Sequence, residues 1–318
     1  MKSEQSEKSE KSEHEQRLHE YKGLIESELE QALHSGTAGV SRVIEAMRYS
    51  TLGTGNRIHG VLTLEFCRLF GKSINAAASV GAAIELIYAS SLIHDDLPCM
   101  NNNDFRGGNP SCHKAFGEAT ALLAKDALIS TALNTVAAVT FLPPPAKVSS
   151  KTITSVISVL SNTMIETAKG KQMEIDFKTF KNAERGSGRT AAITEEDFFG
   201  MYNRRLCASI SAACVCGAIC ANSQDKMTHT ARSFGFSLGF ALQLANDLLD
   251  NNNNAKIAEG ENTTFTTFKA LNIIDLIGKK KTQELIEEHT NTAFKIGKSL
   301  PNGEFLTDYI SLLVDRKI

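Results

Sequence analysis

The segment 74–96 constrains the fold of this chain most strongly. Its apolar and small residues do not alternate as in a strand, because they recur at steps of three and four, which predicts one face of a long α-helix. The helix is expected to end on an acidic pair. The residues of this face are Val80, Ile84, Ile87, Ser91 and Asp95.

Most of the remaining sequence has the same helical character. Hydrophobic residues make up 42% of the 318 residues, prolines number only 6, and tryptophan is absent. This composition, without strand-like alternation, predicts one all-α bundle of about ten helices. Helices are expected over residues 17–34, 39–50, 59–71, 74–96, 118–141, 150–177, 194–222, 225–250, 268–295 and 304–315.

The N-terminal segment 1–16 differs from the rest, since it mixes Ser, Glu and Lys and contains no apolar run. This composition predicts a disordered polar tail ahead of one helical domain over 17–318. It also argues against a secretory signal, which needs an apolar region, and its acidity argues against an organelle transit peptide.

Charge and apolar length exclude two further classes of protein. The formal net charge of −2 provides no basic field for nucleic acid. No apolar run approaches the roughly 20 residues that a transmembrane helix needs, so no membrane span is expected.

The seven cysteines are spread through predicted helices in a chain large enough to fold without disulfides. This pattern predicts reduced thiols and a cytoplasmic location. Four of them fall close together in one apolar segment without histidine, which favours small buried thiols at a close helix contact over a metal site. They are Cys207, Cys214, Cys216 and Cys220.

Acidic residues end two of the predicted helices. Asp95 and Asp96 end the first, and Asp247 and Asp250 end a second helix whose inner face also carries Gln243. A single pair is commonly a solvated helix end. Two pairs that face one cavity would supply the hard oxygen ligands that Mg²⁺ prefers while it bridges to phosphates. The sequence therefore predicts a magnesium site at one cavity mouth.

Several motifs carry a resemblance to a known family. IEAMRYSTLGTGNRIHG, SLIHDDLPCM with FRGGNPSCHKAFGEATALLAKDAL, and LQLANDLLD together resemble the trans-isoprenyl diphosphate synthases, or polyprenyl synthetases, of the bacterial farnesyl and geranylgeranyl diphosphate synthase type. The resemblance extends over most of the chain from about residue 20 and keeps the motifs in order.

The resemblance implies an isoprenoid-synthase bundle around a deep apolar cavity. Such proteins are normally homodimers and bind an allylic diphosphate through Mg²⁺. They ionise its carbon–oxygen bond and add isopentenyl diphosphate to the cation. The chemistry requires counter-charge for the leaving diphosphate and an apolar pocket that excludes water.

On the allylic side the motifs are only partly kept. Asn101 stands at the third ligand position of the first motif, and Asn246 replaces the leading aspartate of the second. Arg205 stands where the family has lysine, Leu206 replaces its threonine partner, and Asn262 replaces a late-loop lysine. The implied metal ligands are Asp95, Asp96, Asn101, Asn246, Asp247 and Asp250. The implied allylic diphosphate contacts are Arg106, Arg205 and Gln243, with Gln172 as a polar residue of the cavity.

On the isopentenyl side four groups are lost or altered. The resemblance assigns this altered site to Asn56, Arg57, His59 and Tyr88, and Gly107 replaces a second arginine. The same comparison places Ser90, beside Ser91, where a bulky aromatic residue stops chain growth at farnesyl length. A cavity floored by these serines is expected to admit a longer tail.

Three functions follow from this pattern. The first is a short-chain trans-prenyltransferase with weakened condensation, which family membership makes the default. The second is a terpene cyclase that uses one allylic diphosphate, because the allylic half survives better. The third is a non-catalytic subunit of a heteromeric synthase, so that the partner is either a second copy or an active synthase. The Cys216-x-x-x-Cys220 spacing resembles one seen in such subunits, and chance placement explains it equally well.

Overall fold

The computed structural model describes residues 2–34, 41–52, 55–143, 147–187, 193–258 and 273–314. Within these ranges the chain forms helices α1 to α12, a 3-10 helix η1 and one short hairpin. It divides into two compact units: unit 1 contains residues 1–158 and 213–228, and unit 2 contains residues 159–212 and 229–318. The predicted all-α class is confirmed.

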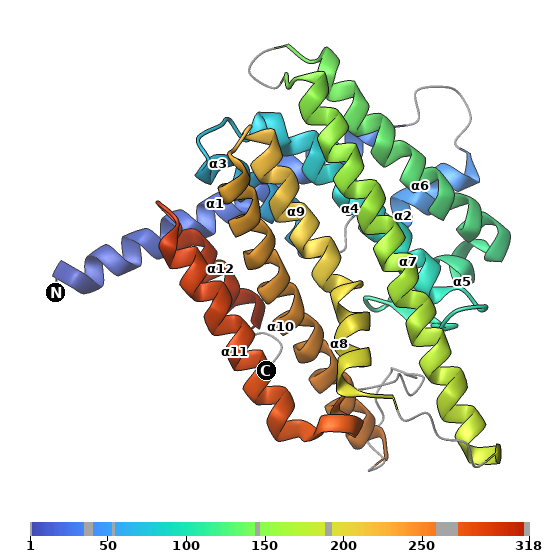
Figure 1. Ribbon diagram of the computed structural model, residues 1–318. Helices are drawn as coiled ribbons and strands as arrows, with labels where there is room; N and C mark the ends of the chain where they lie inside the picture. The colour runs from blue at the N-terminus through green and yellow to red at the C-terminus, as the bar shows by residue number, and fades with distance from the viewer. Residues whose placement is uncertain are drawn as a thin grey trace. The chain divides into compact units, whose positions relative to one another are not determined.

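In unit 1 the central element is α4, which packs against α1, α2, α3, α5 and α6 (Figure 1). The unit contains α1 (Lys2–Ala32), α2 (Arg42–Thr51), α3 (Ile58–Leu69), α4 (Asn75–Asp96), β1 (Phe105–Arg106), β2 (Asn109–Pro110), α5 (Cys112–Phe116), α6 (Glu118–Ala138) and η1 (Val139–Phe141).

Unit 2 contains α8 (Glu195–Asn203), α11 (Ile274–Ser299) and α12 (Glu304–Val314). Both units share α7 (Ser150–Ser187), α9 (Leu206–Cys220) and α10 (Asp225–Ala258). In unit 2, α10 packs closely on α9 because Gly235 and Gly239 of α10 face α9. A Cβ on Gly239 would lie 2.7 Å from the Cα of Cys207. The centroid of the Phe240 ring lies 4.3 Å from that of the His289 ring of α11.

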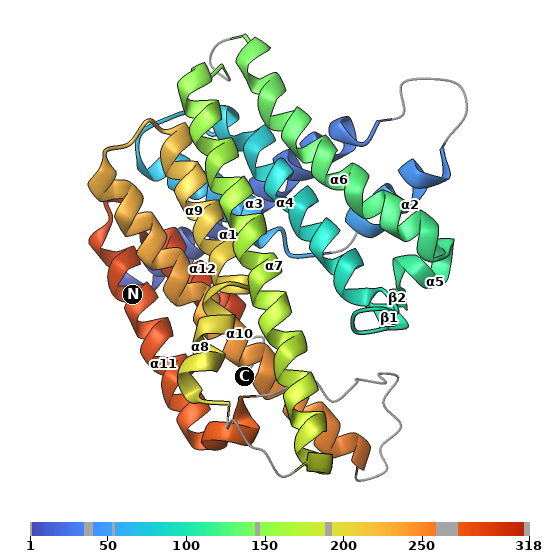
Figure 2. The same cartoon turned by 45° about the vertical axis from the view of Figure 1, so that its right-hand side comes forward.

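The hairpin between α4 and α5 was not predicted (Figure 2). Its two strands pair Arg106 with Asn109, so Gly107 and Gly108 form the turn. Both glycines have positive φ, 58° and 84°, a conformation that side chains with a Cβ rarely adopt. The glycine that replaces an expected arginine therefore serves the turn.

Some predicted boundaries were wrong. The helix expected over 194–222 is broken into α8 and α9 at Arg204 and Arg205. There the chain approaches α7 so closely that a Cβ on Gly170 would lie 2.9 Å from the Cβ of Arg204. The helix expected over 150–177 extends to Ser187.

The N-terminal helix α1 begins at Lys2 and includes residues for which the sequence predicts a disordered tail. Glu, Gln and Lys are good helix formers, which is why a polar segment without apolar residues is compatible with a helix. The domain boundary between residues 16 and 17 stays a prediction.

The buried cysteines agree with the prediction of apolar thiols. Cys207, Cys214, Cys216 and Cys220 are all buried, and none of them forms a disulfide. In unit 1, a Cβ on Gly217 would lie 2.3 Å from the carbonyl oxygen of Thr63, so α9 and α3 approach closely beside the thiols. Burial raises the pKa of the Cys214 and Cys220 thiols, which favours the protonated form.

Within the described residues, two helical segments are long and apolar enough to cross a membrane by length and composition alone, so the expected absence of a membrane span stays a prediction. Asn75–Asp96 is 78% buried within the protein, as a core helix is, whereas Glu118–Phe141 is only 28% buried. The apolar side chains that α6 exposes include Leu122 and Leu123.

Candidate functional site

The first acidic motif lies at the C-terminal end of α4. Asp96 is buried, and the hairpin delivers Arg106 to it: Arg106 Nε donates to Asp96 Oδ2 at 3.0 Å, and Nη2 donates to Oδ1. Asn103 Nδ2 also donates to Oδ1, at 2.8 Å. The carboxylate of Asp96 is thus neutralised by an arginine whose side chain stays 44% exposed.

Asp95 and Asn101 lie together at the same helix end. Both residues are half-buried, and the backbone amide of Asn101 donates to the carbonyl oxygen of Asp95 at 3.1 Å. Carboxylate and amide oxygens are suitable ligands for Mg²⁺, but an amide brings no charge. Over the described part of the chain, His, Cys, Asp and Glu form no group of three that could hold a metal ion. The side-chain oxygens of Asp95 and Asn101 are suitable ligands for Mg²⁺, but they carry less negative charge than a set of three carboxylates would.

In unit 2 the second motif is held by neighbouring side chains. Tyr202 of α8 donates its hydroxyl hydrogen to Asp247 Oδ2, and Gln243 Nε2 donates to Oδ1 at 3.1 Å. Burial and the Asp247 carboxylate raise the pKa of the Tyr202 phenol, so it stays a donor. The role of Tyr202 was missed from the sequence, because a lone tyrosine in another helix carries no spacing signal.

For the other predicted residues on the allylic side, the structure describes fewer contacts. Asn246 is half-buried. The side chain of Asp250 and all of Asn262 lie outside the described residues. Since the two acidic motifs belong to different units, their convergence at one cavity mouth stays a prediction.

The predicted cavity residue on α7, Gln172, stays a prediction. Gln172 is exposed and donates to Asp176 at 2.8 Å on the surface of the helix. The neighbouring Lys171 and Glu174 are buried instead, and Lys171 Nζ lies 3.0 Å from Glu174 Oε2. Arg205 Nη1 lies 3.0 Å from the same oxygen. The helical phase of α7, set by its packing, decides which polar residue faces inward.

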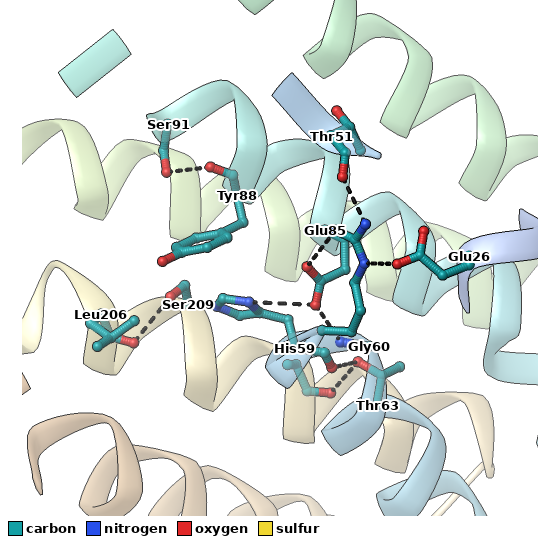
Figure 3. Close-up of polar contacts among 12 residues, drawn as sticks. Glu26, Thr51, His59, Gly60, Thr63, Glu85, Tyr88, Ser91, Leu206 and Ser209 are labelled. Carbon is teal, nitrogen blue, oxygen red and sulfur yellow. Dashed lines mark hydrogen bonds and ion pairs between the residues drawn. The ribbon is translucent and has the colours of Figure 1, made fainter. Parts of the chain in front are cut away.

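Two of the predicted isopentenyl residues, Arg57 and His59, are buried in unit 1 beside Glu85 (Figure 3). Arg57 is 5% exposed; its Nε donates to Glu26 Oε1 at 2.6 Å, and its Nη2 donates to the carbonyl oxygen of Thr51 at 2.7 Å. Its Nη1 lies 4.0 Å from Glu85 Oε2. Asn56 is exposed.

His59 and Tyr88 complete this network. His59 Nδ1 lies 3.8 Å from Glu85 Oε1, and the His59 and Tyr88 rings are 4.5 Å apart between centroids (Figure 3). Burial lowers the pKa of the His59 imidazole to about 4 and raises the pKa of the Glu85 carboxyl. His59 is therefore neutral near pH 7 and adds no charge for binding a diphosphate.

The predicted floor residues differ in burial. Ser90 is 3% exposed, while Ser91 is half-buried and donates its hydroxyl hydrogen to the carbonyl oxygen of Tyr88 at 2.7 Å. Ser90 is therefore covered by other parts of the protein, and its effect on chain length stays a prediction.

Comparisons with known proteins agree with this fold. Among solved structures, a farnesyl/geranylfarnesyl diphosphate synthase of Zymomonas mobilis superposes with a TM-score of 0.76 at 25% identity, covering 95% of this chain and 99% of its own. A geranyltranstransferase of Thermotoga maritima gives a TM-score of 0.74 at 26% identity, covering 94% and 97%.

Among sequences, geranylgeranyl pyrophosphate synthase 10 (mitochondrial) of Arabidopsis thaliana is 33% identical over 209 residues, which are 66% of this chain and 58% of that relative. This chain therefore spans less than two thirds of that relative's length. The large subunit 2 of the heterodimeric geranylgeranyl pyrophosphate synthase of the same plant is 29% identical over 85% of this chain and 68% of its own. The polyprenyl synthetase family profile matches residues 40–296. The chain belongs to the polyprenyl synthetase family, in which the predicted fold and motif order are found together.

Proposed function

We propose that this protein is a short-chain trans-prenyltransferase-type enzyme that acts on an allylic isoprenyl diphosphate with Mg²⁺ and condenses it weakly with isopentenyl diphosphate. The observation that carries this proposal is the cluster of Asp95, Asp96 and Arg106 at the end of α4. It puts oxygen ligands beside an accessible guanidinium, which is what a metal-bound diphosphate requires.

In this mechanism each acidic motif would hold Mg²⁺, the first through Asp95 and Asn101 and the second through Asp247 and Asp250, and the bound metal would neutralise the diphosphate as it leaves. Arg106 binds diphosphate oxygens through its exposed edge while its other edge stays on Asp96. Arg205 is a second candidate contact, and Glu174 orients its guanidinium. The allylic carbon–oxygen bond breaks, the diphosphate keeps the electron pair, and apolar side chains exclude water from the cation.

A second candidate function is a non-catalytic subunit of a heteromeric synthase. The observation that favours it is the buried Arg57 network, which leaves the predicted isopentenyl site without a free cationic face toward solvent. Relatives include large subunits of heterodimeric synthases. The partner would be either a second copy or an active synthase. It would bury the exposed apolar side chains of α6, Leu122 and Leu123.

The discriminating experiment incubates the purified full chain with Mg²⁺ and farnesyl diphosphate, with and without isopentenyl diphosphate, and analyses the products. Elongated diphosphate supports the proposed enzyme, whereas a cyclic hydrocarbon or alcohol would assign a terpene cyclase. Absence of turnover alone, with altered product from an added active synthase, would assign the non-catalytic subunit.

We also propose a cytoplasmic location. All seven cysteines are free, in agreement with a reducing compartment. Imaging of the full chain with a C-terminal fluorescent tag tests this, and an organellar signal would contradict it.

A further inference from the structure

The most unusual charge arrangement in unit 1 surrounds Arg57 at the start of α3. The guanidinium contacts two carboxylates from different helices, Glu26 of α1 and Glu85 of α4, and one backbone carbonyl. A diphosphate would offer a guanidinium the same chemistry, namely several anionic oxygens at hydrogen-bond distance. The protein thus supplies its own oxygens where the resemblance expects a ligand.

The two carboxylates are not equivalent. The Glu85 side chain is 5% exposed and accepts a hydrogen bond from the backbone amide of Gly60 at 3.0 Å, so it is part of the core. The Glu26 side chain is 39% exposed, and its Oε1 is 2.6 Å from Arg57 Nε. Glu26 therefore separates the buried guanidinium from solvent, and an anion from solvent would have to replace it.

The local backbone supports this arrangement. Arg57 has φ of 54° and ψ of 38°, a left-handed conformation that is unusual for a residue with a side chain. Such a conformation persists where side-chain contacts hold it, and the contacts here run to Glu26, Glu85 and Thr51.

We propose that Glu26 is a specificity-determining residue: its carboxylate occupies the anion-binding face of Arg57 and weakens the binding of a second diphosphate at this site. The inference rests on the proposed function only because that function assigns this site to isopentenyl diphosphate. The competition between the Glu26 carboxylate and an anion for Arg57 does not depend on enzymatic activity. Replacing the Glu26 carboxylate by the neutral amide of glutamine removes the ion pair with Arg57 and a like-charge repulsion toward the incoming anion. The amide oxygen can still accept a hydrogen bond from Arg57 Nε, but it competes less strongly with an anion because it carries no charge.

The test compares Glu26→Gln with Glu28→Gln. Glu28 lies on the same helix and accepts a hydrogen bond from Ser79 of α4 at 2.7 Å, so it is a matched glutamate that links α1 to α4 without touching an arginine. The probe is inorganic diphosphate without divalent metal, titrated by calorimetry into each folded full-length variant. We expect Glu26→Gln to bind about tenfold more tightly than the parent, and Glu28→Gln to bind as the parent does.

A double variant assigns the gain to the guanidinium. Adding Arg57→Lys to Glu26→Gln keeps the positive charge but removes the planar fork, so most of the gained affinity should disappear. Unchanged affinity in Glu26→Gln, or an equal gain in Glu28→Gln, overturns the inference, even if thermal unfolding shows that Glu26 stabilises the fold. Because this readout needs no turnover, a failure of the proposed enzymatic activity is seen separately, in the product analysis.

Discussion

Two arginines in unit 1 meet carboxylates, and they differ in what they leave for a ligand. Arg106 is brought by a hairpin to the end of α4, contacts the buried Asp96, and keeps a side-chain exposure of 44%. Arg57 has an exposure of 5% and contacts carboxylates of α1 and α4. An arginine at a helix end can still exchange its protein partner for a diphosphate, whereas one enclosed between helices contributes mainly to the fold.

The largest effect is expected on the allylic side. Asp95→Asn removes a charge from the predicted metal site, so Mg²⁺-dependent turnover of the allylic diphosphate should fall roughly 100-fold to 1,000-fold. Steady-state kinetics against Mg²⁺ concentration measures this. Asp104→Asn is the control, because Asp104 lies in the same loop and pairs with Lys114 at 2.8 Å on the surface. Equal kinetics in both variants would remove Asp95 from the metal site.

The second prediction concerns stability. Arg57→Met leaves Glu26 and Glu85 without their shared cation, which should lower the free energy of unfolding by about 3–5 kcal/mol. Arg106→Met should lower it by roughly 1 kcal/mol, because Arg106 is partly exposed and Asp96 keeps Asn103. Urea unfolding of both variants tests the contrast. Equal losses of unfolding free energy would mean that Arg57 and Arg106 stabilise the fold to the same extent, which would contradict the comparison.

The third prediction is a pH dependence. The pKa of His59 is about 4 in the folded chain and about 6.5 when unfolded, so the unfolded chain binds more protons in between. Stability from neutral His59 is present above pH 6.5 and lost as the pH falls toward 4, on the order of 2–3 kcal/mol. Glu85, whose pKa is raised by burial, opposes this trend.

Comparing the parent with His59→Gln isolates the imidazole, because Glu85 remains in both. Unfolding free energies at pH 4.5 and 7 should differ less in the variant. An identical pH dependence in the two proteins would show that His59 is not the titrating group.

The fourth prediction restores charge to the acidic motifs. Asn101→Asp together with Asn246→Asp should lower the Mg²⁺ concentration for half-maximal activity by about tenfold, because each change returns a carboxylate to a predicted ligand position. Titration with Mg²⁺ at saturating allylic diphosphate measures it. If the metal dependence stays the same, neither position faces the ion.

The smallest effect is expected at the floor residue. Ser90→Phe places a ring at a buried position, so it should weaken binding of geranylgeranyl diphosphate a few-fold more than that of geranyl diphosphate, while overpacking costs about 1–3 kcal/mol of stability. Competition binding with both diphosphates gives the ratio, with Ser91→Phe as the neighbouring control. An unchanged ratio would exclude Ser90 from the chain-length floor.

The helices and the order of motifs could be read from the sequence because they depend on local spacing. The stripe that ends at Asp95 predicted α4 to its last turn, since a period of three to four residues defines a helix face. The break between α8 and α9 could not be predicted in this way, because it depends on the close approach of Gly170 to Arg204.

The sequence by itself determined which residue types are available to the site: four aspartates, two asparagines at ligand positions, and arginines at 57, 106 and 205. Only the tertiary structure decided what those groups do in the protein without ligand. It placed Tyr202 and Gln243 against Asp247, paired Gln172 with Asp176, and set Glu26 against Arg57. The physical reason is that hydrogen bonds and ion pairs between distant segments depend on helix packing and phase, and local sequence spacing specifies neither.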